Sequence, residues 1–222
     1  MKNIFAVLCA SPLFAGINSG DFAAMMACLG AHTKAYEKGE TICFEGDTVS
    51  EIGLVVSGRL HLVKGDIWGN VSIVNEITPP DMFAEAVVCG GLGRLPVSVL
   101  AKENSEVLFI DYQRIATACA SSCAFHPKLI RNMIQILAQK NILMAAKMEH
   151  ITKRSIKEKL LSYLMEQARQ NSSKAFDIPF NRQELADYLS VERSALSAEM
   201  SRLKARGIID YQKNHFKLLK EN

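Results

Sequence analysis

The sequence predicts an α+β protein in which an antiparallel β-barrel is followed by a long helix and a C-terminal winged helix-turn-helix. Three observations support this order. Residues 33–111 hold short apolar runs between glycine turns, residues 126–170 contain no glycine, and residues 182–219 hold two helical patterns and then two strand patterns. The expected domains are a barrel at 1–125, a dimerisation helix at 126–152 and a winged domain at 153–222.

Glycine corners divide the first half into short strands. Gly39 and Gly46 stand in sequences typical of tight turns with positive φ. Apolar runs such as residues 53–56 and 71–74 lie between the turns. Several short strands at close spacing predict an antiparallel barrel or sandwich. The apolar start of the chain is a poor match to a secretion signal, because Pro12 interrupts it, so we expect a segment packed on this domain.

The long helix carries an apolar pattern with a seven-residue repeat. Two rows alternate, one of Ile130, Leu137, Met144 and Ile151 and one of Ile134, Asn141 and Met148. This alternation is typical of a coiled-coil seam, in which a buried Asn141 would fix the register. The alternative is a helix packed on its own barrel, which would also carry an apolar stripe. We expect these seven residues to form a homodimer interface.

The last domain shows the pattern of a helix-turn-helix. Asn181 is a suitable N-cap with Glu184 as its reciprocal partner, and helices are expected at 182–189 and 193–206. Ser190 occupies the turn, and Gly207 ends the second helix. Strands are expected at 178–180, 208–212 and 215–219, the last two forming a wing.

The charge of the chain changes sign between its halves. Residues 1–125 hold 8 basic and 13 acidic side chains, whereas residues 126–222 hold 18 and 10. A basic second half indicates a polyanionic partner. Arg193 opens the second helix, where an arginine can fork onto guanine in the major groove. The expected DNA-binding residues are Asn181, Arg182, Arg193, Ser194, Ser197, Arg202 and Lys204, although any of the basic ones could instead be a solvated surface charge.

Several motifs resemble one family. The segments KGETICFEGD (38–47), GLVVSG (53–58) and PDMFAEA (80–86) together resemble the sensor barrel of the Crp/Fnr transcription regulators, and residues 182–219 resemble their winged helix. The resemblance implies a jelly-roll barrel of the cyclic-nucleotide-binding type. It also implies a cytoplasmic homodimer that binds a palindromic operator in double-stranded DNA under control of a small-molecule effector. Contact with RNA polymerase, usually activating, is implied too.

The sensor motif departs from the cyclic AMP pattern. Family members that bind cyclic AMP use a Gly-Glu pair for the ribose and an Arg-Ser pair for the phosphate. Here Ala84 precedes Glu85, and Leu95 and Pro96 stand at the phosphate positions. Losing a charge-assisted pair costs about 1.5–3 kcal/mol, so we expect no tight binding of cyclic AMP. The expected effector pocket is apolar and consists of Phe83, Ala84, Glu85, Leu95, Pro96, Val97 and Met144.

Six cysteines are scattered at 9, 28, 43, 89, 119 and 123 without zinc-like pairs. Cys119 and Cys123 would share a helix face, so a redox or iron–sulfur sensing regulator using them with Cys9 or Cys28 stays open as an alternative. No metal or other cofactor is otherwise indicated. No run reaches the about 18 apolar residues of a membrane helix, and no catalytic set points to an enzyme. A cyclic-nucleotide-binding module without a DNA role is the remaining alternative.

Overall fold

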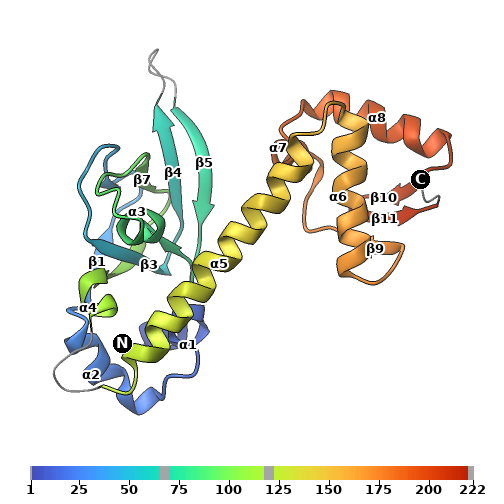
Figure 1. Cartoon of the computed structure of the whole chain (residues 1–222). Helices are drawn as coiled ribbons and strands as arrows, with labels where there is room; N and C mark the ends of the chain where they lie inside the picture. The colour runs from blue at the N-terminus through green and yellow to red at the C-terminus, as the bar shows by residue number, and fades with distance from the viewer. Residues whose placement is uncertain (1, 66–70, 118–122, 220–222) are drawn as a thin grey trace. The chain divides into compact units, whose positions relative to one another are not determined.

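A computed structural model describes residues 2–65, 71–117 and 123–219. The chain forms two compact units, Met1–Ala138 and Gln139–Asn222, which meet inside the long helix α5 (His126–Ile151). Figure 1 shows the strands of the first unit, α5, and the helices and strands of the second unit in chain order. Across the described ranges, no helix is both long and apolar enough to cross a membrane.

The first unit contains two four-stranded sheets whose pairings are all antiparallel, as the sequence predicts. The strand orders are β1-β8-β3-β6 and β2-β7-β4-β5. The strands are β1 (His32–Tyr36), β2 (Thr41–Cys43), β3 (Glu51–Ser57), β4 (Leu60–Gly65), β5 (Val71–Ile77), β6 (Met82–Phe83), β7 (Ser98–Ala101) and β8 (Ser105–Asp111). Both sheets contribute to one apolar core that includes Val55, Leu60, Phe83, Val99 and Phe109.

Glycines permit the tight corners of this domain. Gly39 and Gly46 adopt φ values of 88° and 90°, which confirms the two predicted turns. Gly53 serves a different purpose, because a Cβ atom there would lie 2.2 Å from the ring of Phe83. The missing side chain therefore lets β3 and β6 pair around a buried aromatic ring.

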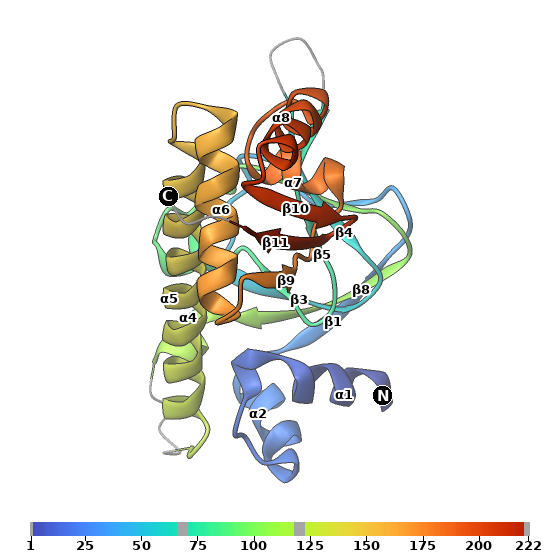
Figure 2. The same cartoon turned by 90° about the vertical axis from the view of Figure 1, so that its right-hand side faces the viewer.

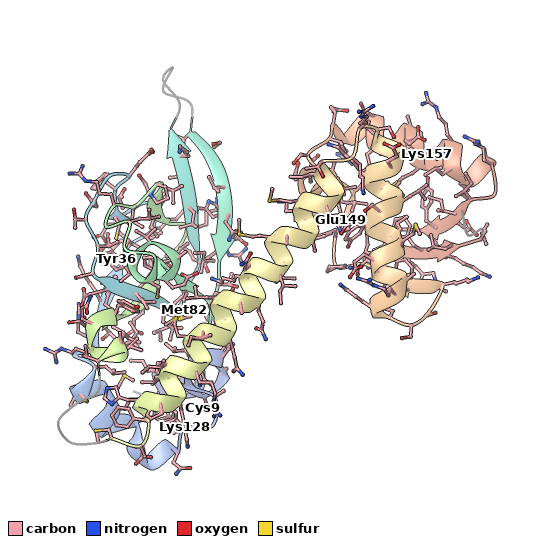
Figure 3. All side chains as sticks on the ribbon, in the orientation of Figure 1. Cys9, Tyr36, Met82, Lys128, Glu149 and Lys157 are labelled. Carbon is pink, nitrogen blue, oxygen red and sulfur yellow. The ribbon has the colours of Figure 1, made fainter. Side chains whose placement is uncertain are left out.

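Short helices close the first unit: α1 (Lys2–Ala10), α2 (Phe22–Cys28), α3 (Glu85–Cys89) and α4 (Tyr112–Ala116), with 3-10 turns at Pro12–Phe14 and Ser19–Asp21. Figures 1 and 2 show α1 and α2 beside the first turns of α5. Leu8 of α1 is buried in their shared core, which confirms the expected packing of the N-terminal segment. Met82, labelled in Figure 3, belongs to the same core.

The first half of α5 packs on its own domain. Leu129, Met133 and Ile136 are buried there, and the amide of Asn132 donates hydrogen bonds to the carbonyls of Leu13 (2.9 Å) and Ala15 (3.0 Å). The predicted alternative, a helix that packs on its own domain, therefore applies to the face of α5 that carries these three apolar residues.

The second unit is a three-stranded antiparallel sheet with three helices, and Figure 2 shows α6 running along the sheet. The elements are α6 (Ile156–Gln170), β9 (Ala175–Asp177), α7 (Arg182–Tyr188), α8 (Arg193–Ala205), β10 (Ile209–Gln212) and β11 (His215–Leu218). The wing strands are confirmed to within a residue. The strand expected at 178–180 lies at 175–177 instead, where Phe176 pairs with Phe216. Pro179 has no N–H to offer a ladder.

Caps set the helix ends of this unit. Asn181 and Glu184 form the predicted capping box at α7, and Ser155 and Glu158 form another at α6. Ser190 adopts a φ of 52°, so it takes the left-handed conformation for which many such turns use glycine. The helix-turn-helix is thus built as the sequence indicates, with serine in the strained turn.

Candidate functional site

The start of α8 presents an exposed arginine. Arg193 is the first residue of the helix and is solvent-exposed. Within the described residues, its guanidinium forms no hydrogen bond or salt bridge. All of its donors are therefore available to a base edge or a phosphate without breaking an internal contact.

A carboxylate caps the same helix. The side chain of Glu192 accepts hydrogen bonds from the backbone amides of Ser194 (2.7 Å) and Ala195 (3.1 Å), and from the Ser194 hydroxyl. The hydroxyl bond, followed by the two backbone bonds, lowers the pKa of Glu192. The Ser194 hydroxyl is thus already bonded to Glu192 and would have to exchange this bond to contact DNA. The sequence did not indicate this cap, because glutamate is an uncommon N-cap residue.

Arg182 is held against the wing. Its guanidinium lies 5.2 Å from the ring centroid of Tyr211 and 6.0 Å from that of Phe216, and it contacts the sulfur of Met200. Half-burial lowers the pKa of Arg182. These contacts fix the side chain between α7, α8 and the wing, so it positions those elements as well as carrying charge.

Two further basic residues of α8 that were expected to contact DNA have internal partners. Lys204 lies 2.6 Å from Asp210 of the wing and 5.1 Å from the ring centroid of Tyr211. Arg202 pairs with Glu199 at 3.2 Å, the intrahelical contact that competes with a DNA role. Both side chains are exposed, so a phosphate could still recruit them by exchange of partners.

The remaining predicted DNA contacts differ in their availability. Ser197 is half-buried, and its carbonyl accepts a hydrogen bond from Ser201. The Asn181 side-chain oxygen accepts from the amides of Gln183 and Glu184, so only its amide nitrogen is left to donate. A further basic residue outside that set, Arg206, is the C-cap of α8 and is exposed. Arg193 is therefore the least encumbered of the predicted contacts.

The predicted dimer residues of α5 divide into two groups. Ile134, Met144 and Met148 are 62%, 66% and 57% exposed, and Asn141 is exposed beside them. Ile130 and Leu137 are half-buried against the core of their own domain, and Ile151 is half-buried as well. Two further exposed residues, Ile142 and Leu143, fall outside the predicted rows.

Three of the predicted effector residues, Phe83, Ala84 and Glu85, lie at the start of the short helix α3. Ala84 is its N-cap and adopts a φ of 65°, a conformation that favours the glycine it replaces. Glu85 is 5% exposed, and Phe83 packs in the barrel core with its ring centroid 6.3 Å from that of Phe109. Phe83 is therefore used mainly for packing inside the barrel.

The second half of the predicted pocket is a loop braced by its backbone. Leu95 is 4% exposed and exchanges backbone hydrogen bonds with Gly46 (2.8 Å) and Asp47 (3.0 Å). Pro96 is exposed and Val97 half-buried. Met144 belongs to the second unit, and its place in this pocket stays a prediction.

One group of side chains could hold a metal. Cys28, Cys123 and His126 offer ligand atoms that all lie within 4.8 Å of one another. Cys119, the predicted partner of Cys123, lies outside the described residues. Nothing in the local sequence brings His126 to Cys28, so this group was not predicted.

Comparison with known proteins places both units. Residues 33–122 match the model of the cyclic nucleotide-binding domain, and residues 158–222 match that of the Crp-like helix-turn-helix domain. The chain is 24% identical over 190 residues to the transcriptional activator protein FnrA of Stutzerimonas stutzeri, covering 82% of this chain and 75% of that protein. It is 26% identical over 196 residues to the transcriptional activator protein FnrL of Cereibacter sphaeroides, covering 79% and 71%.

Solved structures agree with this fold. The c-di-GMP responsive global regulator CLP of Xanthomonas campestris aligns over 92% of this chain and 100% of its own, with a TM-score of 0.57 and 14% identity. A cyclic nucleotide-binding domain from Methylobacillus flagellatus aligns over 69% and 85%, with a TM-score of 0.56 and 12% identity. With the two family models and a helix-turn-helix that presents Arg193, the chain belongs to the Crp/Fnr family of transcription regulators.

Proposed function

We propose that this regulator acts in the cytoplasm as a homodimer on a palindromic operator and responds to an effector other than cyclic AMP. The observation that carries the proposal is the exposed Arg193 at the first position of α8, whose donors are not engaged within the described part of the chain. A recognition helix places its N-terminal residues against base edges. Arg193 is therefore the residue that contacts bases of the operator. Arg182 and Lys204, which contact the wing, add positive charge to the DNA-binding surface.

The exposed row of α5 supports the dimer. Ile134, Met144 and Met148 are each more than half exposed, although each side chain gains about 1.5–3 kcal/mol when fully buried. Pairing with a second copy through α5 would cover this row. Such a two-fold dimer reads a two-fold symmetric operator, since both subunits present the same helix.

The apolar residue at the expected phosphate position supports the choice of effector. Leu95, at the expected phosphate position, is 4% exposed and braced by backbone hydrogen bonds. A cyclic phosphate would meet an apolar side chain there instead of a guanidinium. Calorimetry with cyclic AMP should show no binding at micromolar concentrations, and a micromolar dissociation constant would contradict the proposal.

The main test is selection from a random duplex library with the full chain under reducing conditions. We expect a two-fold symmetric site whose half-sites lie about one helical turn apart. Enrichment of an asymmetric site, or of the same sequences by Arg193→Ala, would contradict the proposal. If nothing is enriched, repeating the selection with small metabolites from cell extract tests for an obligatory effector, and failure there too would count against DNA reading.

Activation through RNA polymerase is the proposed output. The relatives FnrA and FnrL are named as transcriptional activators. In vitro transcription from a promoter that carries the selected site should increase when the protein is added. A decrease on the same template would instead identify a repressor.

A second candidate function is redox sensing by the same architecture. It is favoured by the thiols of Cys28 and Cys123, whose sulfur atoms lie within 4.8 Å of each other. Anaerobically purified protein would then show a visible absorption band and contain iron with acid-labile sulfide. A colourless, iron-free preparation would count against an iron–sulfur cluster.

A further inference from the structure

We propose that Cys28, Cys123 and His126 form a mononuclear site for a divalent transition metal of the zinc class, at the start of helix α5. The three residues come from different places in the chain. Cys28 is the last residue of α2, Cys123 precedes α5, and His126 is its first residue. All three lie in the first unit, and the proposal is independent of whether this protein reads DNA.

The geometry is close to that of a filled site. Each of the three residues offers one ligand atom, and these atoms lie within 4.8 Å of one another. The Cys28 sulfur also lies 4.0 Å from Nε2 of His126, the ring nitrogen that does not serve as the ligand. In a tetrahedral zinc site, bond lengths of about 2.3 Å to sulfur and about 2.0 Å to nitrogen place ligand atoms roughly 3.5–3.8 Å apart. Ligand atoms up to 4.8 Å apart would therefore have to approach one another by at most about 1.0–1.3 Å to complete the site.

The hydrogen bonding of His126 prepares one nitrogen for a metal. Nε2 lies 3.0 Å from the carbonyl oxygen of Arg114, and because a carbonyl only accepts, Nε2 must carry the hydrogen. The lone pair is then on Nδ1. This atom is buried and has no hydrogen-bond partner among the described residues, and the whole residue is only 4% exposed. A metal-ligating histidine typically donates its other N–H to such a carbonyl.

Neighbouring side chains hold this arrangement in place. The ring of Phe125 packs on His126 with a centroid separation of 4.7 Å. The Arg114 guanidinium reaches the carbonyl of Cys28 at 3.5 Å, so α2, α4 and α5 meet at this point. An unpartnered buried nitrogen is costly, and a metal would satisfy it.

The donor set indicates the class of metal. Thiolate and imidazole ligands suit zinc and related borderline-soft ions, whereas calcium and magnesium prefer oxygen. Iron–sulfur clusters usually take four thiolates, and this group offers two thiols with an imidazole. Three protein ligands leave a fourth position, which water fills in open zinc sites.

A metal here would join the end of α2 to the first turn of α5. If α5 forms the dimer as proposed above, metal occupancy would act on the start of that helix. This last step rests on the proposed function, so binding is measured on the protein without DNA. Failure of the metal site would leave the DNA selection unaffected, and the reverse also holds.

The test uses the full chain, reduced and freed of metal by a chelator. Zinc is titrated in competition with a chromophoric chelator, and cobalt serves as a visible probe of thiolate coordination. We expect one ion per chain and cobalt bands typical of tetrahedral thiolate ligation. Cys28→Ser, Cys123→Ser and His126→Gln should each weaken zinc binding by more than about 100-fold. Circular dichroism checks that each variant folds.

Cys43→Ser is the matched control, because Cys43 is also a half-buried thiol of the same domain. It should bind zinc like the original chain. The proposal is overturned if no ion binds, if the three ligand variants keep full affinity, or if anaerobic reconstitution yields an iron–sulfur cluster on these cysteines.

If the variants fold poorly, alkylation of the unmodified protein decides. Zinc should slow the labelling of Cys28 and Cys123 at least tenfold by mass spectrometry, while Cys43 labels at an unchanged rate. Equal rates with and without zinc would overturn the proposal.

Discussion

Replacing Arg193 tests the reading helix most directly. Arg193 is exposed at the first position of α8, and within the described residues its side chain makes no hydrogen bond or salt bridge. Removal therefore breaks no hydrogen bond or salt bridge among the described residues, so the loss of affinity reports mainly on DNA. A bidentate arginine–guanine contact contributes about 1–3 kcal/mol to discrimination, which is roughly 5- to 150-fold.

Fluorescence anisotropy with the selected operator and a shuffled duplex of equal length provides the assay. Arg193→Ala should weaken operator binding by roughly 5- to 150-fold and change binding to the shuffled duplex little. Arg193→Lys keeps the charge but loses the fork, so it should recover little of the discrimination.

Arg206→Ala is the matched control, because Arg206 is an exposed arginine at the other end of the same region. It should weaken both duplexes alike and reduce the salt dependence by about one phosphate contact. If Arg193→Ala weakens both duplexes equally, Arg193 contacts only the backbone, and the assignment of base reading to it is wrong.

Three further predictions follow from the packing. Met144→Lys should weaken dimerisation at least about 100-fold, measured by sedimentation equilibrium, since two apolar side chains per dimer lose their burial. Met165→Lys on α6, where Met165 is 53% exposed, should leave dimerisation unchanged. Equal effects of the two substitutions would contradict the α5 interface. Gly53→Ala should lower the free energy of unfolding in urea by about 1–3 kcal/mol or more, because its Cβ would lie 2.2 Å from the Phe83 ring, and an unchanged midpoint would contradict this packing. Burial lowers the pKa of His150 below 6.5, so the unfolded chain takes up a proton at a higher pH than the folded chain does. The free energy of unfolding should therefore be largest above pH 6.5 and decrease toward pH 5. This decrease should be smaller in His150→Gln.

Local signals account for most of the correctly predicted fold. Glycine turns at Gly39 and Gly46 and the capping pair Asn181 and Glu184 depend on neighbouring residues only, and the structure confirms them. The misplaced strand at 178–180 shows the limit of such signals. An apolar run predicts burial, but pairing of Phe176 with Phe216 decides which residues join the ladder.

Long-range placement could not be predicted. The seven-residue pattern of α5 indicates an apolar helix, but periodicity does not say that Leu129, Met133 and Ile136 face the helix's own domain while Met144 stays exposed. Cys28 and His126 are 98 positions apart and meet only because α2 packs beside the start of α5. Likewise, no local motif shows that Arg182 lies over the wing aromatics.

The contacts of Arg182 and Lys204 have a mechanical consequence. One connects α7 to the rings of the wing, and the other connects α8 to Asp210, so the winged domain is cross-braced from both helices. A winged domain braced in this way keeps its internal structure when an effector binds. Regulation would then move the whole winged domain as a rigid body toward or away from the major groove.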